Sequence, residues 1–488
     1  MKKQSNRSLL KSIAVCAIAF FTITLSFAQD KAKQIDQLMS LYNTYGQLNG
    51  SVLVSEHGKV IFKKGYGLAN MEWNIPNQPD TKFRLGSISK QFTALLIVKL
   101  AEEGKVKLDV PITTYLPDYP KATGDKITIH HLLTHTSGIP NYTSFPNFFK
   151  DQSRNPFTPA DFVKTFQNLP LEFTPGEKFN YSNSGYFLLG YIIEKITAKS
   201  YEQYLQETIL TPLKMTNTGY DHSDIILKNR AAGYEKRGKI ITNASYIDMS
   251  IPYAAGSLYS TVEDLYLWDQ ALYTNKLLSP ASMDLLYKPY IRKGDEAYGY
   301  GWFIGEFANG GKDKLKVIEH GGGINGFNTI ISRLPADKNL VVILNNTGGT
   351  VLGEMNEAIR AILYNQPYQQ PKKSTAFELL DVFATKGLTA GIDTYQKLKN
   401  DPTYGIKEGD INNVGYQLLQ TGKTKEAIEI FKINVATFPK SGNVYDSLGE
   451  AYLKDGNTKL AIENYKKSME LDPTNESGKK ALEEISKK

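Results

Sequence analysis

The stretch FRLGSISK, residues 83–90, decides the fold and runs directly into an apolar segment at 91–100. It places Ser87 three residues before Lys90. At a helix start this spacing brings both side chains to one face, one turn apart. A desolvated amine can accept a hydroxyl proton, and free N–H groups at the helix N-terminus can hold an oxyanion. The pair indicates a serine nucleophile with a lysine base, although Ser-x-x-Lys alone is common on solvated helix faces.

Two further segments carry groups that suit this chemistry. Tyr181 and Asn183 lie two residues apart in the loop sequence FNYSNSGY, residues 179–186. A phenol can shuttle a proton, and a carboxamide can bind a substrate amide or hold the lysine. The segment EHGGG, residues 319–323, closes a predicted strand. Glycine at a strand edge lets a substrate backbone lie against it, and the N–H of Gly323 would be a second oxyanion donor.

In this order and with roughly these separations, Ser-x-x-Lys, Tyr-x-Asn and His-x-Gly resemble the motifs of the penicillin-recognising serine hydrolases. The resemblance is strongest to the branch that holds class C β-lactamases, D-alanyl-D-alanine carboxypeptidases, D-aminopeptidases and related esterases. It covers about residues 33–365, including HLLTHTSG at 131–138 and GSLYST at 256–261. The substrate implied is an ester or amide, small or peptidic, and no metal or organic cofactor is implied.

The resemblance also implies a role for each motif residue. Ser87 attacks a carbonyl and becomes acylated, while Lys90 and Tyr181 share the proton transfers. The backbone amides of Ser87 and Gly323 hold the oxyanion, and Asn183 positions the acyl chain. The implied site is therefore a catalytic set and a substrate-binding set: Ser87, Lys90 and Tyr181; Asn183, His320, Gly322 and Gly323.

The third motif departs from the class C pattern. Those enzymes usually carry Lys-Thr-Gly where this chain has His320-Gly321-Gly322. A histidine is mostly neutral near pH 7, and Gly321 has no hydroxyl with which to grip a carboxylate. We therefore expect weak β-lactamase activity, and an esterase, amidase or D-peptidase fits at least as well.

The pattern along the chain predicts an α/β fold. Strand signals stand at both ends of residues 33–365 and surround a helical middle, which indicates one antiparallel sheet flanked by terminal helices, with an inserted all-helical lobe. The active site is expected in the groove between sheet and lobe. The predicted strands are 50–56, 59–66, 300–305, 315–319, 328–334 and 340–344, and the predicted helices include 36–45, 91–100 and 352–364.

A polar segment with two prolines, residues 366–374, reads as a linker to a second module at 375–488. Five positions of that module recur at a spacing of 34, among them Gly415 with Gly449 and Phe431 with Tyr465. This period resembles the tetratricopeptide repeat, and a helix near 479–485 would cap it. A groove that binds a protein partner is the functional interpretation, and structural padding is the alternative.

The N-terminus has the layout of a cleavable secretory signal over residues 1–28. Basic residues precede an apolar run from Ile13 to Phe27, and the expected cut follows Ala28. An uncleaved anchor is the alternative, but the run is shorter than the roughly 20 residues that span a bilayer. The only cysteine, Cys16, lies in this run, so the mature chain is expected to have no disulfide or thiolate metal site. We expect a periplasmic or secreted protein with no later membrane span.

Other interpretations of the same residues are weaker. The chain has no block of five or more Lys and Arg residues, which argues against nucleic-acid binding. His131 and His135 have the spacing of a metal pair, but Leu132 stands where a metalloprotease glutamate would be. An inactive hydrolase fold that acts as a sensor or scaffold through its repeats is the rival function. The complete set of Ser87, Lys90 and Tyr181 favours an enzyme.

Overall fold

The computed structural model describes residues 30–311, 314–350 and 352–487, so the predicted signal segment 1–28 with Cys16 lies outside the described residues. The chain forms two compact units. The first extends to Lys236 and resumes from Ile241 to Gln369, and the second contains Arg237–Ile240 and Gln370–Lys488. Within the described part of the chain, no helix is both long and apolar enough to cross a bilayer.

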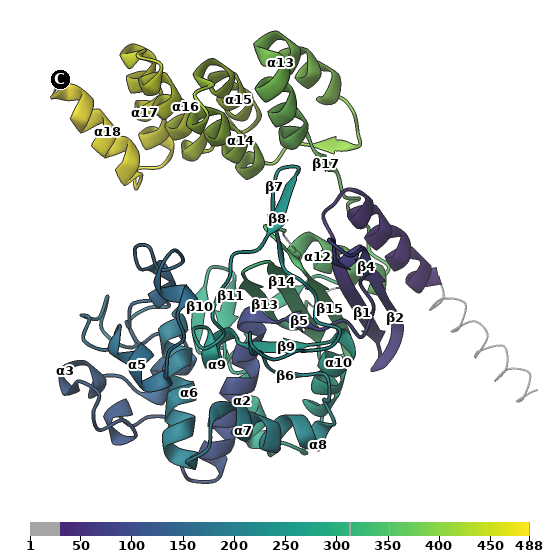
Figure 1. Cartoon of the computed structure of the whole chain (residues 1–488), viewed down its shortest axis with the longest axis vertical. Helices are drawn as coiled ribbons and strands as arrows, with labels where there is room; N and C mark the ends of the chain where they lie inside the picture. Colours follow the sequence, from purple (N-terminus) through teal and green to yellow (C-terminus); the bar gives the residue numbers. More distant parts are fainter. Residues whose placement is uncertain (1–29, 312–313, 351, 488) are drawn as a thin grey trace, which may run out of the picture. The chain divides into compact units, whose positions relative to one another are not determined.

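An antiparallel sheet of eight strands forms the centre of the first unit (Figure 1). Its first strand along the chain pairs with a late one, with Gly50 opposite Asn345, so the sheet joins the two ends of the hydrolase sequence. In spatial order the strands are β10 (Ile291–Lys293), β11 (Glu296–Tyr298), β12 (Phe303–Phe307), β13 (Leu315–Ile324), β14 (Phe327–Leu334), β15 (Asn339–Asn345), β1 (Gly50–Glu56) and β2 (Lys59–Tyr66).

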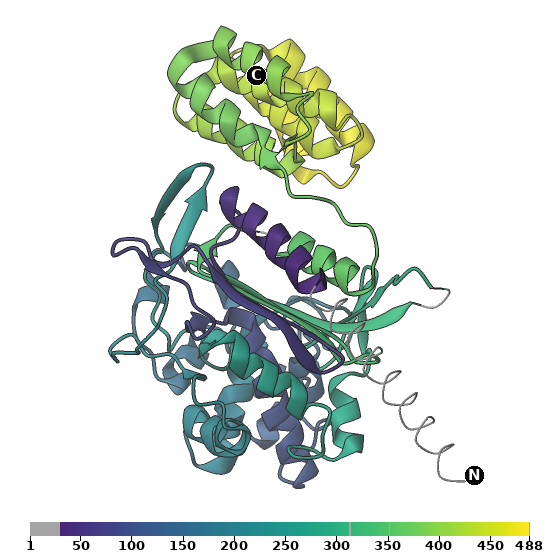
Figure 2. The ribbon, with the colours of Figure 1, turned by 90° about the vertical axis from the view of Figure 1, so that its right-hand side faces the viewer.

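Both faces of the sheet are covered, because alternate residues of the central strands pack into different cores. In β1, Val52 and Val54 join one hydrophobic cluster and Leu53 joins the other. The first cluster is completed by the helix at 30–44 and by α12 (Gly353–Leu363), which lie together on one side of the sheet (Figure 2).

The helical lobe covers the opposite face. Its central helix is α2 (Ser89–Glu102), in which eleven of fourteen residues are buried. A helix that is apolar on every side needs cover on every side, and neighbouring lobe helices supply it. The other main lobe helices are α4 (Ile129–Leu133), α5 (Pro159–Lys164), α6 (Asn183–Thr197), α7 (Tyr201–Leu205), α9 (Tyr253–Gly256), α10 (Val262–Ala271) and α11 (Pro280–Leu286).

The second unit is helical. Gly415 lies against the Phe431 ring, where an added Cβ would approach within 2.4 Å, and Gly449 lies in the same way against Tyr465 at 3.1 Å. Equivalent glycine–aromatic crossings 34 residues apart are what the repeat period predicts. The helices are α13 (Thr375–Leu398, kinked at Gly387), α14 (Glu408–Gln420), α15 (Thr424–Thr437), α16 (Gly442–Lys454), α17 (Thr458–Leu471) and α18 (Glu476–Ser486).

The predicted fold class is confirmed, with shifts at some boundaries. The hairpin 50–56 and 59–66 matches the prediction to the residue. The strand predicted at 315–319 continues to Ile324, because Gly321, Gly322 and Gly323 pair with Ile330, Thr329 and Asn328 of β14. The strand predicted at 300–305 lies instead at β12, Phe303–Phe307.

Candidate active site

Ser87 lies on a short 3-10 turn, Gly86–Ile88, that leads directly into α2. The turn precedes the helix proper, so the serine is presented at its entrance and is partly exposed. Lys90, one turn further, places its Nζ 3.0 Å from Ser87 Oγ. The structure therefore brings the predicted serine and lysine into hydrogen-bond contact.

The Lys90 amine is fully buried and has three hydrogen-bond partners. Besides Ser87 Oγ, these are Asn183 Oδ1 at 2.8 Å and the Ala255 carbonyl oxygen at 2.9 Å. Burial lowers the pKa of Lys90 well below its ordinary value. A neutral amine has two donors and one lone pair. Because Asn183 and Ala255 can only accept at these atoms, the lone pair is left for the Ser87 hydroxyl. This geometry equips Lys90 as a general base.

The Tyr181 phenol is the second proton-transfer group. The Tyr181 ring packs on the His135 ring, with centroids 4.1 Å apart. Lys90 Nζ lies 4.9 Å from the centroid of the Tyr181 ring. Burial raises the pKa of Tyr181, and the nearby Ser87 hydroxyl partly opposes the rise. The buried hydroxyl finds no hydrogen-bond partner among the described residues. A neutral phenol with an unused donor is suited to give a proton to a substrate atom.

A directed chain of hydrogen bonds fixes the state of His320. The Ser182 N–H donates to His135 Nδ1 at 3.1 Å, so His135 carries its proton on Nε2 and donates to Tyr298 Oη at 3.2 Å. The Tyr298 hydroxyl then donates to His320 Nε2 at 3.1 Å, and His320 Nδ1–H donates to the Gly321 carbonyl at 2.6 Å. Both ring nitrogens of His320 are used, and the ring is neutral.

Electrostatics agrees with that assignment. Burial lowers the pKa of His320 to about 3, and Lys90, when it is protonated, contributes to this shift by repulsion. The same two causes lower the pKa of His135 well below its ordinary value. The structure therefore places His320 near Tyr181, with ring centroids 6.3 Å apart, but as a buried uncharged group. It offers no cation to a substrate carboxylate.

Glycines bring strand β13 against the turn that carries Ser87. A Cβ on Gly322 would lie 1.9 Å from the Leu85 carbonyl oxygen, and one on Gly86 would lie 2.9 Å from the Gly323 nitrogen. The pairing of β13 with β12 ends at Glu319, so among the described residues no strand pairs with this edge of β13 beyond Glu319. The backbone of Gly323 thus adjoins Ser87 at a free strand edge, where a substrate carbonyl can be held.

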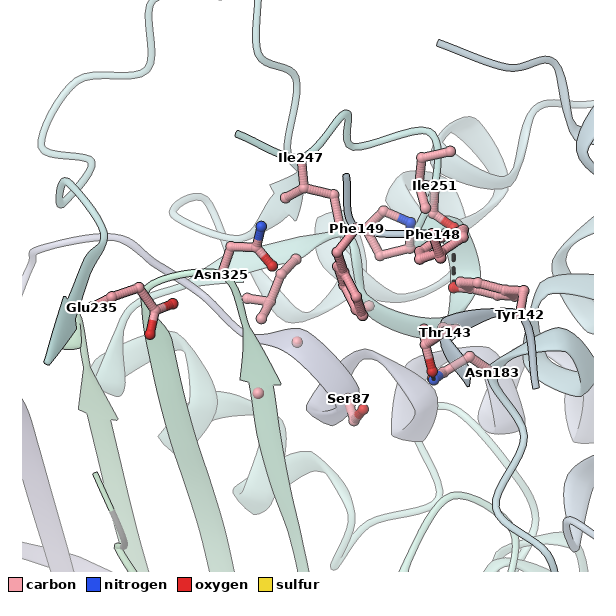
Figure 3. Close-up of a pocket in the computed structure, with 16 residues that line it drawn as sticks. Ser87, Tyr142, Thr143, Phe148, Phe149, Asn183, Glu235, Ile247, Ile251 and Asn325 are labelled. Atoms are coloured by element: carbon pink, nitrogen blue, oxygen red, sulfur yellow. Dashed lines mark hydrogen bonds between the residues drawn. The ribbon is translucent and has the colours of Figure 1, made fainter. Parts of the chain in front are cut away.

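A cavity of about 290 Å³ opens above Ser87 (Figure 3). Ser87, Asn183 and Gly323 line it, whereas Lys90, Tyr181 and His320 do not. Lys90 and His320 are buried, and Tyr181 is partly exposed but has a buried hydroxyl. Its walls are largely apolar and include Phe148, Phe149, Ile247, Ile251, Pro252 and Ile324. The arrangement is a reactive hydroxyl at the base of an apolar pocket, backed by a buried amine and a buried phenol.

Three contributors to the site escaped the sequence analysis. Tyr298 belongs to none of the sequence motifs, yet it links His135 to His320. The Ala255 carbonyl is a backbone group, and its only signal was its place beside the motif at 256–261. Glu235 lines the cavity, and no local pattern marks it.

His131 and His135, considered above as a possible metal pair, both make hydrogen bonds within the protein. His131 Nδ1 accepts from the Thr128 N–H at 3.2 Å and caps α4, while His135 belongs to the chain that leads to His320. Within the described residues, no group of three or more His, Cys, Asp or Glu side chains is placed to hold a metal ion.

Comparison with known proteins identifies relatives of this chain. A family model described as beta-lactamase matches residues 32–364, and one described as tetratricopeptide repeat matches residues 442–475. The chain is 30% identical over 364 residues to penicillin-binding protein 4* of Bacillus subtilis, covering 71% of this chain and 79% of that protein.

Two solved structures extend the likeness. A penicillin binding protein from Bacillus halodurans is 29% identical with a TM-score of 0.59, covering 67% of this chain and 98% of that one. A D-stereospecific amidohydrolase from Streptomyces sp. is 25% identical with a TM-score of 0.56, covering 68% of this chain and 97% of that one. The likeness extends over nearly the whole of both solved chains.

Proposed function

Because the chain belongs to the beta-lactamase family of serine hydrolases, we propose that it is an exported enzyme that hydrolyses an ester or amide through an acyl-enzyme on Ser87. The observation that carries this proposal is the buried Lys90 amine, 3.0 Å from Ser87 Oγ, whose other two partners are acceptors. The basic and apolar N-terminal sequence supports export.

In the acylation step, Ser87 Oγ bonds to the substrate carbonyl carbon and its proton passes to Lys90. The amides of Ser87 and Gly323 stabilise the oxyanion. When the bond to the leaving group breaks, Tyr181 donates a proton to that group and takes one back from Lys90. The lysine is then neutral again and the tyrosine is again a phenol, so the pair is ready for the second step.

In the deacylation step, a water molecule attacks the acyl carbon and its proton passes to the Lys90 and Tyr181 pair. The bond to Ser87 Oγ breaks, and the serine takes its proton from Lys90. The products are the free acid and an unchanged enzyme, and no step needs a metal or an organic cofactor. Asn183 holds Lys90 and lines the cavity, so it contacts both the base and the acyl group.

The neutral His320 favours esters and open-chain amides without a carboxylate over β-lactam antibiotics, which carry one. A penicillin or a peptide C-terminus presents a carboxylate, and the side chain at this position carries no charge with which to bind it. The Streptomyces relative is a D-stereospecific amidohydrolase, which supports amides as candidate substrates of this chain. We therefore expect faster turnover of p-nitrophenyl esters and D-amino-acid amides than of a chromogenic cephalosporin.

An activated fluorophosphonate tests the nucleophile. The full-length protein is treated with the probe, and intact mass and peptide mapping locate the adduct. Wild type and the matched control Ser223→Ala, an exposed serine, are expected to be labelled at residue 87. Ser87→Ala is expected to show no label. A folded wild type that resists labelling would overturn the proposed activity.

A folded wild-type protein that resists labelling would favour the rival function, an inactive hydrolase fold that acts through its repeats. The repeat match at residues 442–475 makes a protein partner a reasonable second candidate for this unit. In that case the hydrolase fold acts as a scaffold, and the repeats grip the partner. Labelling of Ser87 rejects an inactive fold but leaves a partner-binding role for the repeats in place.

A further inference from the structure

The cavity above Ser87 carries charge on only one of its wall residues. Glu235, in strand β7 (Tyr234–Arg237), is the single ionisable acid or base among the described cavity-lining residues apart from the tyrosine Tyr142. No lysine, arginine or histidine side chain lines this cavity within the described part of the chain. An apolar pocket with one carboxylate attracts a cation and repels an anion.

The position of Glu235 is fixed by a backbone contact. Its Oε1 accepts a hydrogen bond of 2.8 Å from the Gly326 N–H, in the turn that connects β13 to β14. Gly326 lies three residues beyond Gly323, the proposed oxyanion donor. At roughly 3.3 Å per residue, the carboxylate stands on the order of 7–10 Å along the strand from the reacting carbonyl. Ile324 and Asn325 line the wall between them.

The direction along β13 identifies the part of the substrate that faces Glu235. Tyr181, the proton donor to the leaving group, packs near His320, which precedes Gly323 on the strand. The leaving group therefore lies toward His320, and the acyl group extends the opposite way, past Ile324. Figure 3 shows Ser87 between Asn183 on one side and Glu235 on the far side of the pocket.

Resting on the proposed function, we propose that the enzyme selects acyl groups that carry a primary ammonium several bonds from the scissile carbonyl. An α-ammonium is too close to the carbonyl to reach Glu235. A chain of about six bonds from the carbonyl carbon to the ammonium nitrogen, each about 1.5 Å long, spans the gap, and its methylene groups lie along the apolar wall. Lysine-like and ω-amino acyl groups have this chemistry, whereas acyl groups that end in a carboxylate are disfavoured.

Three p-nitrophenyl esters of matched length test the proposal: 6-aminohexanoate, hexanoate and the half-ester of adipate. All three acyl chains have six carbons, and they end in an ammonium on C6, in a methyl group and in a carboxylate, respectively. For wild type at low salt, kcat/KM is expected to be about tenfold higher for the aminohexanoate than for the hexanoate, and lowest for the adipate. The difference is expected mainly in KM and to shrink as salt is added.

Glu235→Gln is the decisive variant, because its carboxamide oxygen can still accept from the Gly326 N–H. It is expected to lose the preference for the ammonium, measured as the ratio of kcat/KM for the aminohexanoate to kcat/KM for the hexanoate. Glu306→Gln, at an exposed strand glutamate paired with Lys314, is the control and is expected to keep it. Hexanoate turnover by each variant verifies that its active site is folded.

Two results would overturn the inference alone: equal kcat/KM for aminohexanoate and hexanoate in wild type, or an unchanged preference in Glu235→Gln. A different result addresses the proposed function. If wild type hydrolyses none of the three esters and Ser87 resists the fluorophosphonate, the activity itself is wrong and the inference falls with it.

Discussion

Asn183 Oδ1 accepts a hydrogen bond of 2.8 Å from Lys90 Nζ, and this contact joins the start of helix α6 to helix α2 beneath the cavity. The carboxamide occupies one donor of the amine without adding charge. A carboxylate at the same position would hold the lysine as an ammonium. The uncharged Asn183 carboxamide therefore helps Lys90 to remain neutral and to act as a base.

Asn183→Asp tests that relationship with almost no change in shape. An opposite charge within about 4 Å raises a lysine pKa by about one to three units, so more of the amine is protonated at neutral pH. We expect kcat/KM at pH 7 to fall about tenfold or more, with partial recovery as the pH rises. The pH profile of ester hydrolysis measures the shift of the acidic limb. Asn309→Asp, which adds the same charge outside the site, is expected to leave that limb in place, and an unshifted limb in Asn183→Asp would contradict the assigned role.

Alanine substitutions at two adjacent glycines of β13, Gly322 and Gly321, test whether the close approach of the strand to the Ser87 turn matters for activity. At Gly322 an added Cβ would lie 1.9 Å from the Leu85 carbonyl oxygen, whereas at Gly321 the nearest atom is 3.6 Å away. Gly322→Ala must therefore push β13 away from the turn that carries Ser87, and we expect a loss of activity of about 100-fold. Gly321→Ala is expected to retain most of the wild-type kcat/KM. Equal effects of the two changes would show that the close approach of strand and turn is unimportant.

The buried His320 predicts a dependence of stability on pH. Its pKa is about 3 in the folded protein and about 6.5 when unfolded, so the unfolded state binds more protons between these values. The stabilisation is fully present above pH 6.5 and is lost as the pH falls toward 3. This group alone is expected to remove about 2 kcal/mol of unfolding free energy between pH 8 and pH 5.

Urea unfolding of wild type and His320→Gln at both pH values measures this contribution. The variant lacks the titrating ring, so its unfolding free energy is expected to change less over the same range. Identical pH dependence in the two proteins would mean that His320 is not held neutral by the fold.

In the repeat unit, alanine substitutions at two glycines of helix α14, Gly415 and Gly409, test the contribution of helix packing to stability. An added Cβ at Gly415 would lie 2.4 Å from the Phe431 ring, while at Gly409 nothing lies within 4 Å. Gly415→Ala is expected to destabilise the repeats by about 1–3 kcal/mol through overpacking. Gly409→Ala is expected to be neutral or to stabilise by up to about 1 kcal/mol, because alanine is the better helix former. Thermal unfolding of the full chain followed by circular dichroism distinguishes them.

Local patterns predicted much of the fold. The hairpin at 50–56 and 59–66 has apolar strands bounded by a His-Gly turn, and a 34-residue period identifies the helical repeats. Strand β13 was predicted too short because glycine has little intrinsic tendency to form strands. Its last residues are held instead by the register with β14, a long-range pairing that no local window contains.

The candidate site was predicted where its chemistry is concentrated in short motifs. The serine and lysine are three residues apart, so local helix geometry already brings them together. Tyr298 could not be found in this way, because its partners His135 and His320 are 163 and 22 residues distant. Glu235 is equally hidden, since its position depends on a turn 91 residues further along the chain.

The central claim is that Lys90 is the base that activates Ser87, and the most direct test is the rate at which the fluorophosphonate labels Lys90→Arg compared with wild type. An arginine carries a fixed positive charge and cannot give up its proton in this pH range, so it has no lone pair to offer the Ser87 hydroxyl. We predict that labelling falls by about 100-fold to 10,000-fold at every pH from 6 to 9. Labelling of a folded Lys90→Arg protein at the wild-type rate would contradict the account.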